Sequence, residues 1–169
     1  RRVLRGVFLD GPAQVVLVDT PGIFLSPKNR LDHAMLESAW QTVREADAVL
    51  WLVDSLKKPH EAYDAIRLRL KTAGKPALLV FNKVDAARSK DALLPMLAAW
   101  RDDALFSGGY FFVSALTGDG LQGLRAALAA QMPPGPWLYP EDQVADAPLR
   151  EMAEEITREK LLLAVHQEV

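Results

Sequence analysis

Short apolar segments separated by polar or glycine-containing turns recur along this chain of 169 residues. Most are continuous runs of Val, Leu and Phe, which is typical of strands that are buried on both faces of a sheet. We expect β-strands at residues 3–9, 15–18, 48–54, 77–81 and 110–113. Asp10-Gly11-Pro12 lies between the first two, and this turn chemistry predicts that they pair as an antiparallel hairpin.

Segments with apolar residues at helical spacing lie between these strands. We expect helices around residues 31–43, 62–74, 89–100 and 121–128. Gly74 is placed to end the second helix, and Ser89 to cap the third, which contains Pro95 in its first turns. Strands that alternate with helices indicate an α/β fold with a doubly wound, mostly parallel sheet and one antiparallel edge hairpin.

Residues 132–136, with the sequence MPPGP, interrupt this alternation and indicate a domain boundary. A further helix is expected from about residue 147 onward, because charges of alternating sign lie on one face and apolar residues on the other. We therefore divide the chain into a first domain at 1–132, a linker at 133–148 and the first helix of a second domain at 149–169.

Composition narrows the kind of protein. Half of the residues are hydrophobic, so the chain can bury one good core. The formal net charge of −2 gives no sign of a strongly basic nucleic-acid surface, and the lack of cysteine excludes disulfides and thiolate metal sites. No apolar run approaches the ~20 residues of a transmembrane helix.

Candidate chemistry lies where the strands end, and it is clearest after residues 77–81. Asn82-Lys83-Val84-Asp85 follows this strand, at the edge of a parallel sheet where ligands bind. The carboxylate of Asp85 can accept hydrogen bonds from the ring N–H and the exocyclic amine of guanine, a donor pair that adenine lacks. Asn82 can tie the loop together, and the aliphatic stem of Lys83 can cover a base face. Alone, the motif also fits an ordinary polar loop.

Asp19-Thr20-Pro21-Gly22 follows the strand at residues 15–18 in the same way. Asp19 is placed to act near Mg²⁺ through water, because this hard cation keeps several waters. Gly22 offers a backbone N–H that can approach a γ-phosphate without a side chain in the way, and Pro21 stiffens the approach. A strand followed by a Pro-Gly turn, with no ligand, is the alternative.

Ser114-Ala115-Leu116 follows the strand at residues 110–113. A small residue here lets a backbone N–H come close to the carbonyl oxygen of guanine. The same N–H would face the amino group of adenine, donor against donor, and so would reject that base. The motif carries little weight alone, but it complements the loop at residues 82–85.

Three such motifs, each at the end of an apolar strand and in this order, resemble the guanine-nucleotide-binding P-loop proteins. The resemblance implies a P-loop NTPase-type fold that binds GTP or GDP with Mg²⁺. It implies Asp19 and Gly22 at the magnesium and the γ-phosphate, and residues 82–85 and 114–116 at the base. Ile23 replaces the Gln with which many members orient water, so no catalytic side chain is assigned.

Two features depart from that pattern. Leu116 stands where many members have a Lys that stacks on the base, so we expect a weaker base site. No G-x-x-x-x-G-K-[ST] motif occurs, although this phosphate-binding loop and its strand lie at the centre of P-loop folds. We therefore expect the chain, which begins at Arg1 without an initiator Met, to be a fragment truncated at both ends and inactive in isolation.

The tail carries a narrower resemblance. Residues 139–143 (YPEDQ) and 153–162 (AEEITREKLL) are similar to the linker and the following helix of the Era family of bacterial ribosome-assembly GTPases. In that family the helix opens a KH domain that binds 16S rRNA. The resemblance implies a cytoplasmic, monomeric GTPase of small-subunit assembly and 16S rRNA maturation, with peripheral membrane association as an option and no DNA partner.

Two other interpretations stay open. One is another ribosome- or tRNA-related GTPase, against which the tail argues. The other is a guanine-nucleotide-binding module without hydrolysis, against which the intact Asp19, Gly22, Asn82 and Asp85 argue. In the leading interpretation GTP and Mg²⁺ order residues 19–29, and hydrolysis releases them.

Overall fold

The computed structural model describes residues 5–20, 29–57, 62–87, 93–98, 100, 103–143, 145 and 156–161. Its strands are β1 (Arg5–Asp10), β2 (Ala13–Val18), β3 (Val49–Asp54), β4 (Ala77–Asn82) and β5 (Tyr110–Phe112). Its helices are α1 (Arg30–Glu45), α2 (Ala62–Ala73), α3 (Leu94–Ala98) and α4 (Leu121–Gln131), with the short 3-10 turns η1 (Val84–Ala86) and η3 (Ala104–Phe106). Each strand and helix expected before the boundary at residues 132–136 is present, with shifts at its ends.

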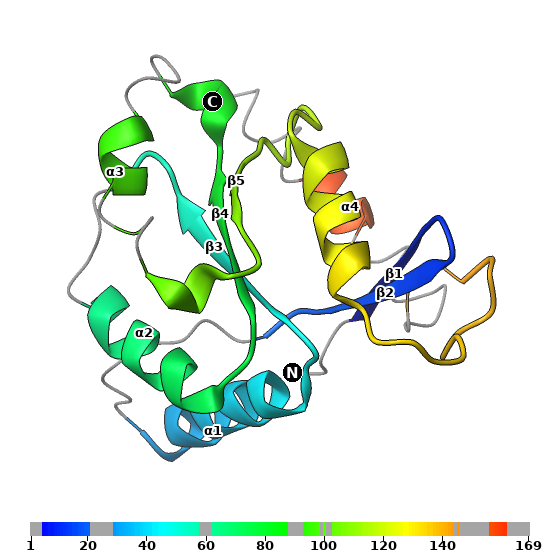
Figure 1. Cartoon of the computed structure of the whole chain (residues 1–169), viewed down its shortest axis with the longest axis horizontal. Coiled ribbons are helices and arrows are strands. Elements are labelled where there is room, and N and C mark those ends of the chain that lie inside the picture. Colours follow the sequence, from blue (N-terminus) through cyan, green and yellow to red (C-terminus); the bar gives the residue numbers. More distant parts are fainter. Residues whose placement is uncertain are drawn as a thin grey trace.

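The centre of the molecule is a parallel sheet in the order β3–β4–β5 (Figure 1). β4 lies in the middle, and five of its six residues are buried, which explains its unbroken apolar sequence. Ala77, Leu79 and Phe81 belong to the core cluster on the side of α1 and α2, whereas Leu78 and Val80 pack with α4. One strand therefore supplies both halves of the core, and it becomes polar only at its carboxyl end.

Helix ends follow local signals. Asn29 precedes α1, and its side-chain oxygen accepts a hydrogen bond from the backbone N–H of Asp32 at 2.8 Å. Gly74 follows α2 with a φ of +65°, a left-handed conformation that favours glycine, so the predicted helix end is confirmed.

The third helix is shorter than predicted. α3 contains Pro95 in its first turn, as expected, but it ends before Trp100, and the expected cap Ser89 lies outside the described residues. Trp100 is nevertheless buried, because its ring packs edge-on against Trp51 and Tyr63 with centroid distances of 5.1 and 5.6 Å. The apolar spacing that reaches Trp100 therefore reflects core packing and not a continued helix.

β1 and β2 form the predicted antiparallel hairpin, in the register that pairs Arg5 with Val18. The hairpin is a separate two-stranded sheet in the described part of the chain, so it does not extend the edge of the parallel sheet. A groove of about 360 Å³ lies between β2 and β3, and apolar side chains such as Leu17, Leu50 and Leu52 line it. The predicted α/β class is confirmed. Among the described residues, β2 pairs only with β1 and β3 only with β4, so each has one edge without a partner strand there.

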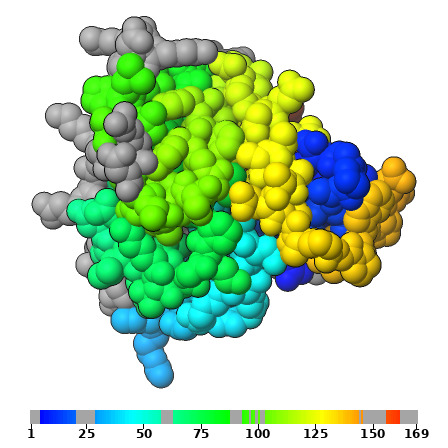
Figure 2. Space-filling model, viewed as in Figure 1, coloured from blue at the N-terminus to red at the C-terminus, as the bar shows by residue number. Residues whose placement is uncertain are grey.

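The segment after α4 runs along the hairpin without helix or strand (Figure 2). The side-chain oxygen of Gln14 accepts hydrogen bonds from the backbone N–H groups of Leu138 (2.9 Å) and Tyr139 (3.0 Å). Its side-chain nitrogen donates to the carbonyl of Tyr139 at 2.8 Å, and the indole of Trp137 donates to the carbonyl of Pro12 at 3.0 Å. The predicted linker is therefore fastened to the hairpin.

Residues 156–161 are helical, within the helix expected from about residue 147. The remainder of that expected helix lies outside the described residues, so the division into domains stays a prediction. No helix in the described part of the chain combines the length and the apolar character needed to cross a membrane.

Candidate functional site

The loop after β4 begins with a side chain that joins two strand ends. Asn82 closes β4, and its side-chain oxygen accepts hydrogen bonds from the backbone N–H groups of Lys83 (2.8 Å) and Ala115 (3.0 Å). Ala115 belongs to the loop after β5, which pairs in parallel with β4. The structure thus brings together, at the carboxyl ends of two neighbouring strands, the loops that the sequence assigns to a base.

Lys83 adopts a φ of 69°, and no other non-glycine residue in the described part of the chain has a positive φ. Its ammonium lies 2.9 Å from one carboxylate oxygen of Asp54, the last residue of β3, and the N–H of Leu56 donates to the other oxygen at 3.0 Å. The hydrogen bond from Lys83, helped by that from Leu56, holds the pKa of the Asp54 carboxyl below its usual value. Sequence reasoning did not single out Asp54, although a carboxylate that ends the apolar run at residues 48–54 was a visible signal.

Asp85 lies in the turn η1 with an exposed side chain. The backbone N–H of Val84 donates to the carbonyl of Val113 at 3.2 Å and fixes the start of this turn. Within the described residues, no hydrogen bond or ion pair involves the carboxylate of Asp85. With respect to that part of the chain, both of its oxygens are available to accept hydrogen bonds from a ligand.

The loop after β5 is anchored at Ser114, which is 0% exposed and whose N–H donates to the carbonyl of Asp119 at 2.9 Å. Gly120 ends this loop with a φ of +73°, and a Cβ at this position would lie 2.2 Å from the carbonyl oxygen of Phe112. Only glycine fits there. Leu116, by contrast, is 86% exposed and projects from the anchored loop.

Asp19 and Thr20 follow β2 and line the groove between β2 and β3. Pro21, Gly22 and Ile23 lie outside the described residues. Among the residues that the structure describes, no hydrogen bond connects Asp19 to the loops after β4 and β5. The two loops assigned to a base are thus joined through Asn82, whereas Asp19 follows a strand of the other sheet. The described residues contain no group of three or more His, Cys, Asp or Glu that could hold a metal ion.

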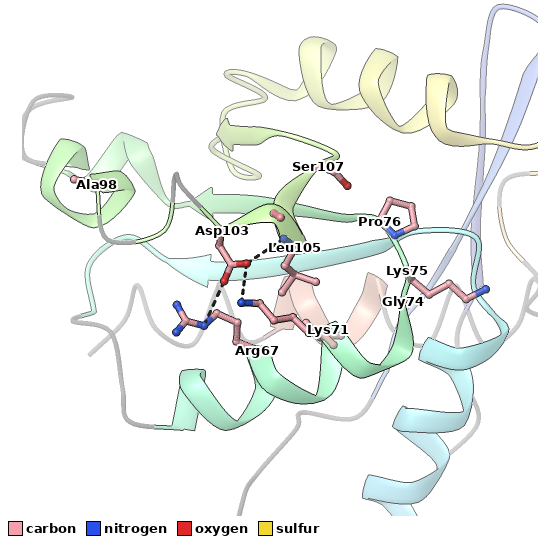
Figure 3. A pocket seen from close by; sticks show the side chains of 11 residues that line it. Arg67, Lys71, Gly74, Lys75, Pro76, Ala98, Asp103, Leu105 and Ser107 are labelled. Carbon is pink, nitrogen blue, oxygen red and sulfur yellow. Dashed lines mark hydrogen bonds and ion pairs between the residues drawn. The ribbon is translucent and has the colours of Figure 1, made fainter.

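A second cavity, of about 930 Å³, lies beside the amino ends of β4 and β5, between α2 and η3 (Figure 3). Arg67 and Lys71 approach the carboxylate of Asp103 at 3.4 and 3.0 Å, and the N–H of Leu105 donates to it at 3.0 Å. Burial alone would raise the pKa of Asp103, but the Leu105 N–H and the Lys71 ammonium outweigh it and lower the pKa. None of the predicted site residues lines this cavity, and two of its cations are already paired with Asp103.

Comparison with known proteins identifies a family. Residues 1–83 match the family described as 50S ribosome-binding GTPase. GTPase Era of Afipia carboxidovorans is 49% identical and that of Rhizobium meliloti 46% identical, each over 100% of this chain. The chain covers 54% and 53% of these two proteins, so it spans about half the length of the curated relatives that it matches.

Solved structures agree with this result. Aquifex aeolicus Era bound to GDP and AlF4⁻ is 32% identical, with a TM-score of 0.82, and the match covers 96% of this chain and 55% of that one. Era in complex with MgGDPNP and nucleotides 1506–1542 of 16S ribosomal RNA is 33% identical, with a TM-score of 0.82, and covers 95% and 54%. The resemblance drawn from the sequence is confirmed: this chain belongs to the Era family of GTPases.

Proposed function

We propose that this chain supplies the guanine-nucleotide-binding part of a GTP-hydrolysing switch protein that acts in small ribosomal subunit assembly. The observation that carries the proposal is the junction made by Asn82, whose side chain joins the loop of Asp85 to the loop of Ala115. The solved Era structures with GDP and AlF4⁻ and with MgGDPNP and 16S rRNA support it. Neither alternative interpretation gains support from the comparisons.

In this proposal Asp85 recognises the guanine base. Its exposed carboxylate accepts hydrogen bonds from the ring N–H and the amine of guanine. The N–H of Ala115 is already donated to Asn82. The backbone hydrogen bonds among the described residues include none from the N–H of Leu116. We therefore assign the Leu116 N–H to the carbonyl oxygen of guanine, and the aliphatic stem of Lys83 to one face of the base.

We assign the phosphate side to the end of β2. The exposed carboxylate of Asp19 fits the preference of Mg²⁺ for oxygen ligands, held through water, and Thr20 lies beside it. The bound ion supplies positive charge that stabilises the phosphate oxygens. The roles of Pro21, Gly22 and Ile23 stay predictions. Because Ile23 cannot orient water, hydrolysis would rest on electrostatic stabilisation by phosphate-side groups, a backbone group, a second cation or a partner.

The groove between β2 and β3 supports the assignment of residues 1–132 to a GTPase domain without its phosphate-binding loop. Within the part of the chain that the structure describes, β2 and β3 each have one edge without a partner strand. These edges and apolar walls such as Leu17 (40% exposed) and Leu52 (58% exposed) suit an inserted β-strand. We propose that the strand leading into the phosphate-binding loop occupies this groove in the full-length protein, and that this chain alone is inactive.

We further propose that residues 133–148 are a linker and that residues 149–169 open a KH-type domain, which would carry the contact with 16S rRNA. This chain alone is then expected to bind RNA weakly. The cytoplasmic location, the monomeric state and the peripheral membrane contact stay predictions.

Calorimetric titration of GDP, GTP and ATP with Mg²⁺ into this chain and into the full-length protein tests the proposal. We expect guanine-selective binding in the full-length protein and much weaker binding in this chain, because most of the affinity comes from the phosphate-binding loop. If neither sample prefers guanine over adenine nucleotides, the assignment of residues 82–85 is wrong.

A further inference from the structure

We infer that Asp54 is a positioning residue for guanine recognition, acting through Lys83; the inference rests on the proposed function. Asp54 ends β3 directly opposite Asn82 in the parallel register of β3 and β4. Both of its carboxylate oxygens are engaged, one by the N–H of Leu56 (3.0 Å) and the other by the Lys83 ammonium (2.9 Å). Its side chain is 19% exposed and that of Lys83 55%, so the better-buried Asp54 fixes the more exposed Lys83.

Lys83 needs such an anchor because its backbone conformation is unfavourable. A φ of 69° is left-handed, which residues with a Cβ rarely adopt. Two contacts hold Lys83 in it: its N–H donates to Asn82 at 2.8 Å, and its ammonium binds Asp54. Lys83 stands between β4 and the turn that carries Asp85, so its conformation sets the direction in which Asp85 leaves the sheet.

Charge gives the pair a second role. An anionic nucleotide at the carboxyl edge of the sheet would be repelled by an uncompensated Asp54 carboxylate, and the Lys83 ammonium neutralises it at 2.9 Å. Exposed ion pairs contribute little to folding stability. The pair should therefore affect nucleotide affinity and base selectivity far more than the folding of the protein.

A double-mutant cycle in the full-length protein tests this inference. The variants are Asp54→Asn, which keeps an acceptor for the Leu56 N–H, Lys83→Met, which keeps an aliphatic stem, and the two combined. We expect Asp54→Asn alone to weaken GDP binding by about fivefold or more and to lower the GDP-over-ADP selectivity. In the Lys83→Met background the same change should not weaken GDP binding and should restore part of it, because it removes a carboxylate that no ammonium neutralises. Asp47→Asn, an exposed carboxylate before β3, is the matched control and should bind GDP like the unaltered protein.

The outcomes separate this inference from the proposed function. An unaltered protein without preference for GDP over ADP would mean that the proposed function fails. A preference for GDP that Asp54→Asn leaves intact, or an equal loss in both backgrounds, would overturn the role of Asp54. If the Asp54→Asn variant does not fold, Asp54→Glu and Asp54→Gln are compared instead, because their side chains have nearly the same size and only Glu keeps the negative charge. The inference then requires tighter GDP binding by Asp54→Glu, and equal affinities would overturn it.

Discussion

At the scale of single residues, the structure divides one motif into parts with different tasks. The side-chain oxygen of Asn82 is occupied by the N–H groups of Lys83 and Ala115, so Asn82 holds the two loops together. Asp85, three positions later, is exposed, and its carboxylate has no hydrogen bond or ion pair within the described residues. The sequence predicted both residues, but the structure indicates which of them remains available to a ligand.

Asp85→Asn should change base preference in the full-length protein. The carboxamide presents one donor and one acceptor where the carboxylate has two acceptors, which suits the base edge of xanthine better than that of guanine. We expect GDP affinity to fall at least tenfold, which corresponds to about 1.4 kcal/mol, and XDP affinity to rise. Competition of GDP, XDP and ADP for the site measures this, with ADP affinity as the internal control. Unchanged base preference would remove Asp85 from the site.

At the scale of elements, a buried carboxylate fastens η3 to α2. The side chain of Asp103 is 7% exposed, caps η3 through the N–H of Leu105 and pairs with Arg67 and Lys71 of α2 (Figure 3). These contacts lie next to the core cluster that contains Trp100 and Phe106, near the amino end of β4, whereas the candidate site lies at the carboxyl end of that strand. A buried carboxylate with several donors is costly to leave unpaired, so this group acts on stability.

Asp103→Asn should destabilise the fold by on the order of 1–3 kcal/mol, because it removes the charge that Arg67 and Lys71 face. The matched control Asp64→Asn removes an 80% exposed carboxylate that also pairs with Arg67, and it should cost less than about 0.5 kcal/mol. Urea unfolding of both variants measures the difference. Equal costs would contradict the structural role of Asp103.

The lowered pKa of Asp103 predicts how the difference in stability between the unaltered protein and Asp103→Asn depends on pH. Because the pKa is lower in the folded state, the stabilisation is fully present above the ordinary value of 3.8 and is lost as the pH falls through the folded pKa. The stability gap between the unaltered protein and Asp103→Asn should therefore narrow below about pH 3.8 and stay constant above it. A stability gap between the two proteins that widens as the pH falls would contradict this prediction.

At the scale of the whole molecule, the hairpin links two distant regions. One end of β2 leads to Asp19, and the other carries Gln14, which fastens the segment after α4 through Leu138 and Tyr139. The arginine of α4, Arg125, also donates to the carbonyl of Leu9 at 2.8 Å. The predicted linker is therefore held by the same two strands that lead to the assigned phosphate side.

Gln14→Ala should release this segment. It removes three hydrogen bonds to residues 138 and 139, each worth roughly 0.5–1.5 kcal/mol. Trp137, which is 44% exposed, should become more accessible to iodide, while Trp40, Trp51 and Trp100, all 9% exposed or less, stay protected. Tryptophan fluorescence quenching measures this. Gln41→Ala on the exposed surface of α1 is the control, and quenching equal to that control would contradict the attachment.

Local patterns determined most of the fold. Apolar runs such as residues 77–81 and turn residues at the hairpin predicted the order and type of the elements, because burial and turn geometry act on residues close in sequence. The same reasoning placed the polar motifs at the ends of their strands. It made the third helix too long, because the spacing that includes Trp100 serves the core and resembles helical spacing.

By itself, the sequence determined the α/β class, the strand-end motifs and the family, since each depends on neighbouring residues or on order along the chain. Only the tertiary structure decided that Asp54 pairs with Lys83, that Asn82 joins two loops and that Gln14 holds the segment at residues 138–139. These contacts join residues 29, 33 and 124 positions apart. Hydrophobic periodicity cannot encode them, because each depends on how strands and loops pack in space rather than on the local sequence.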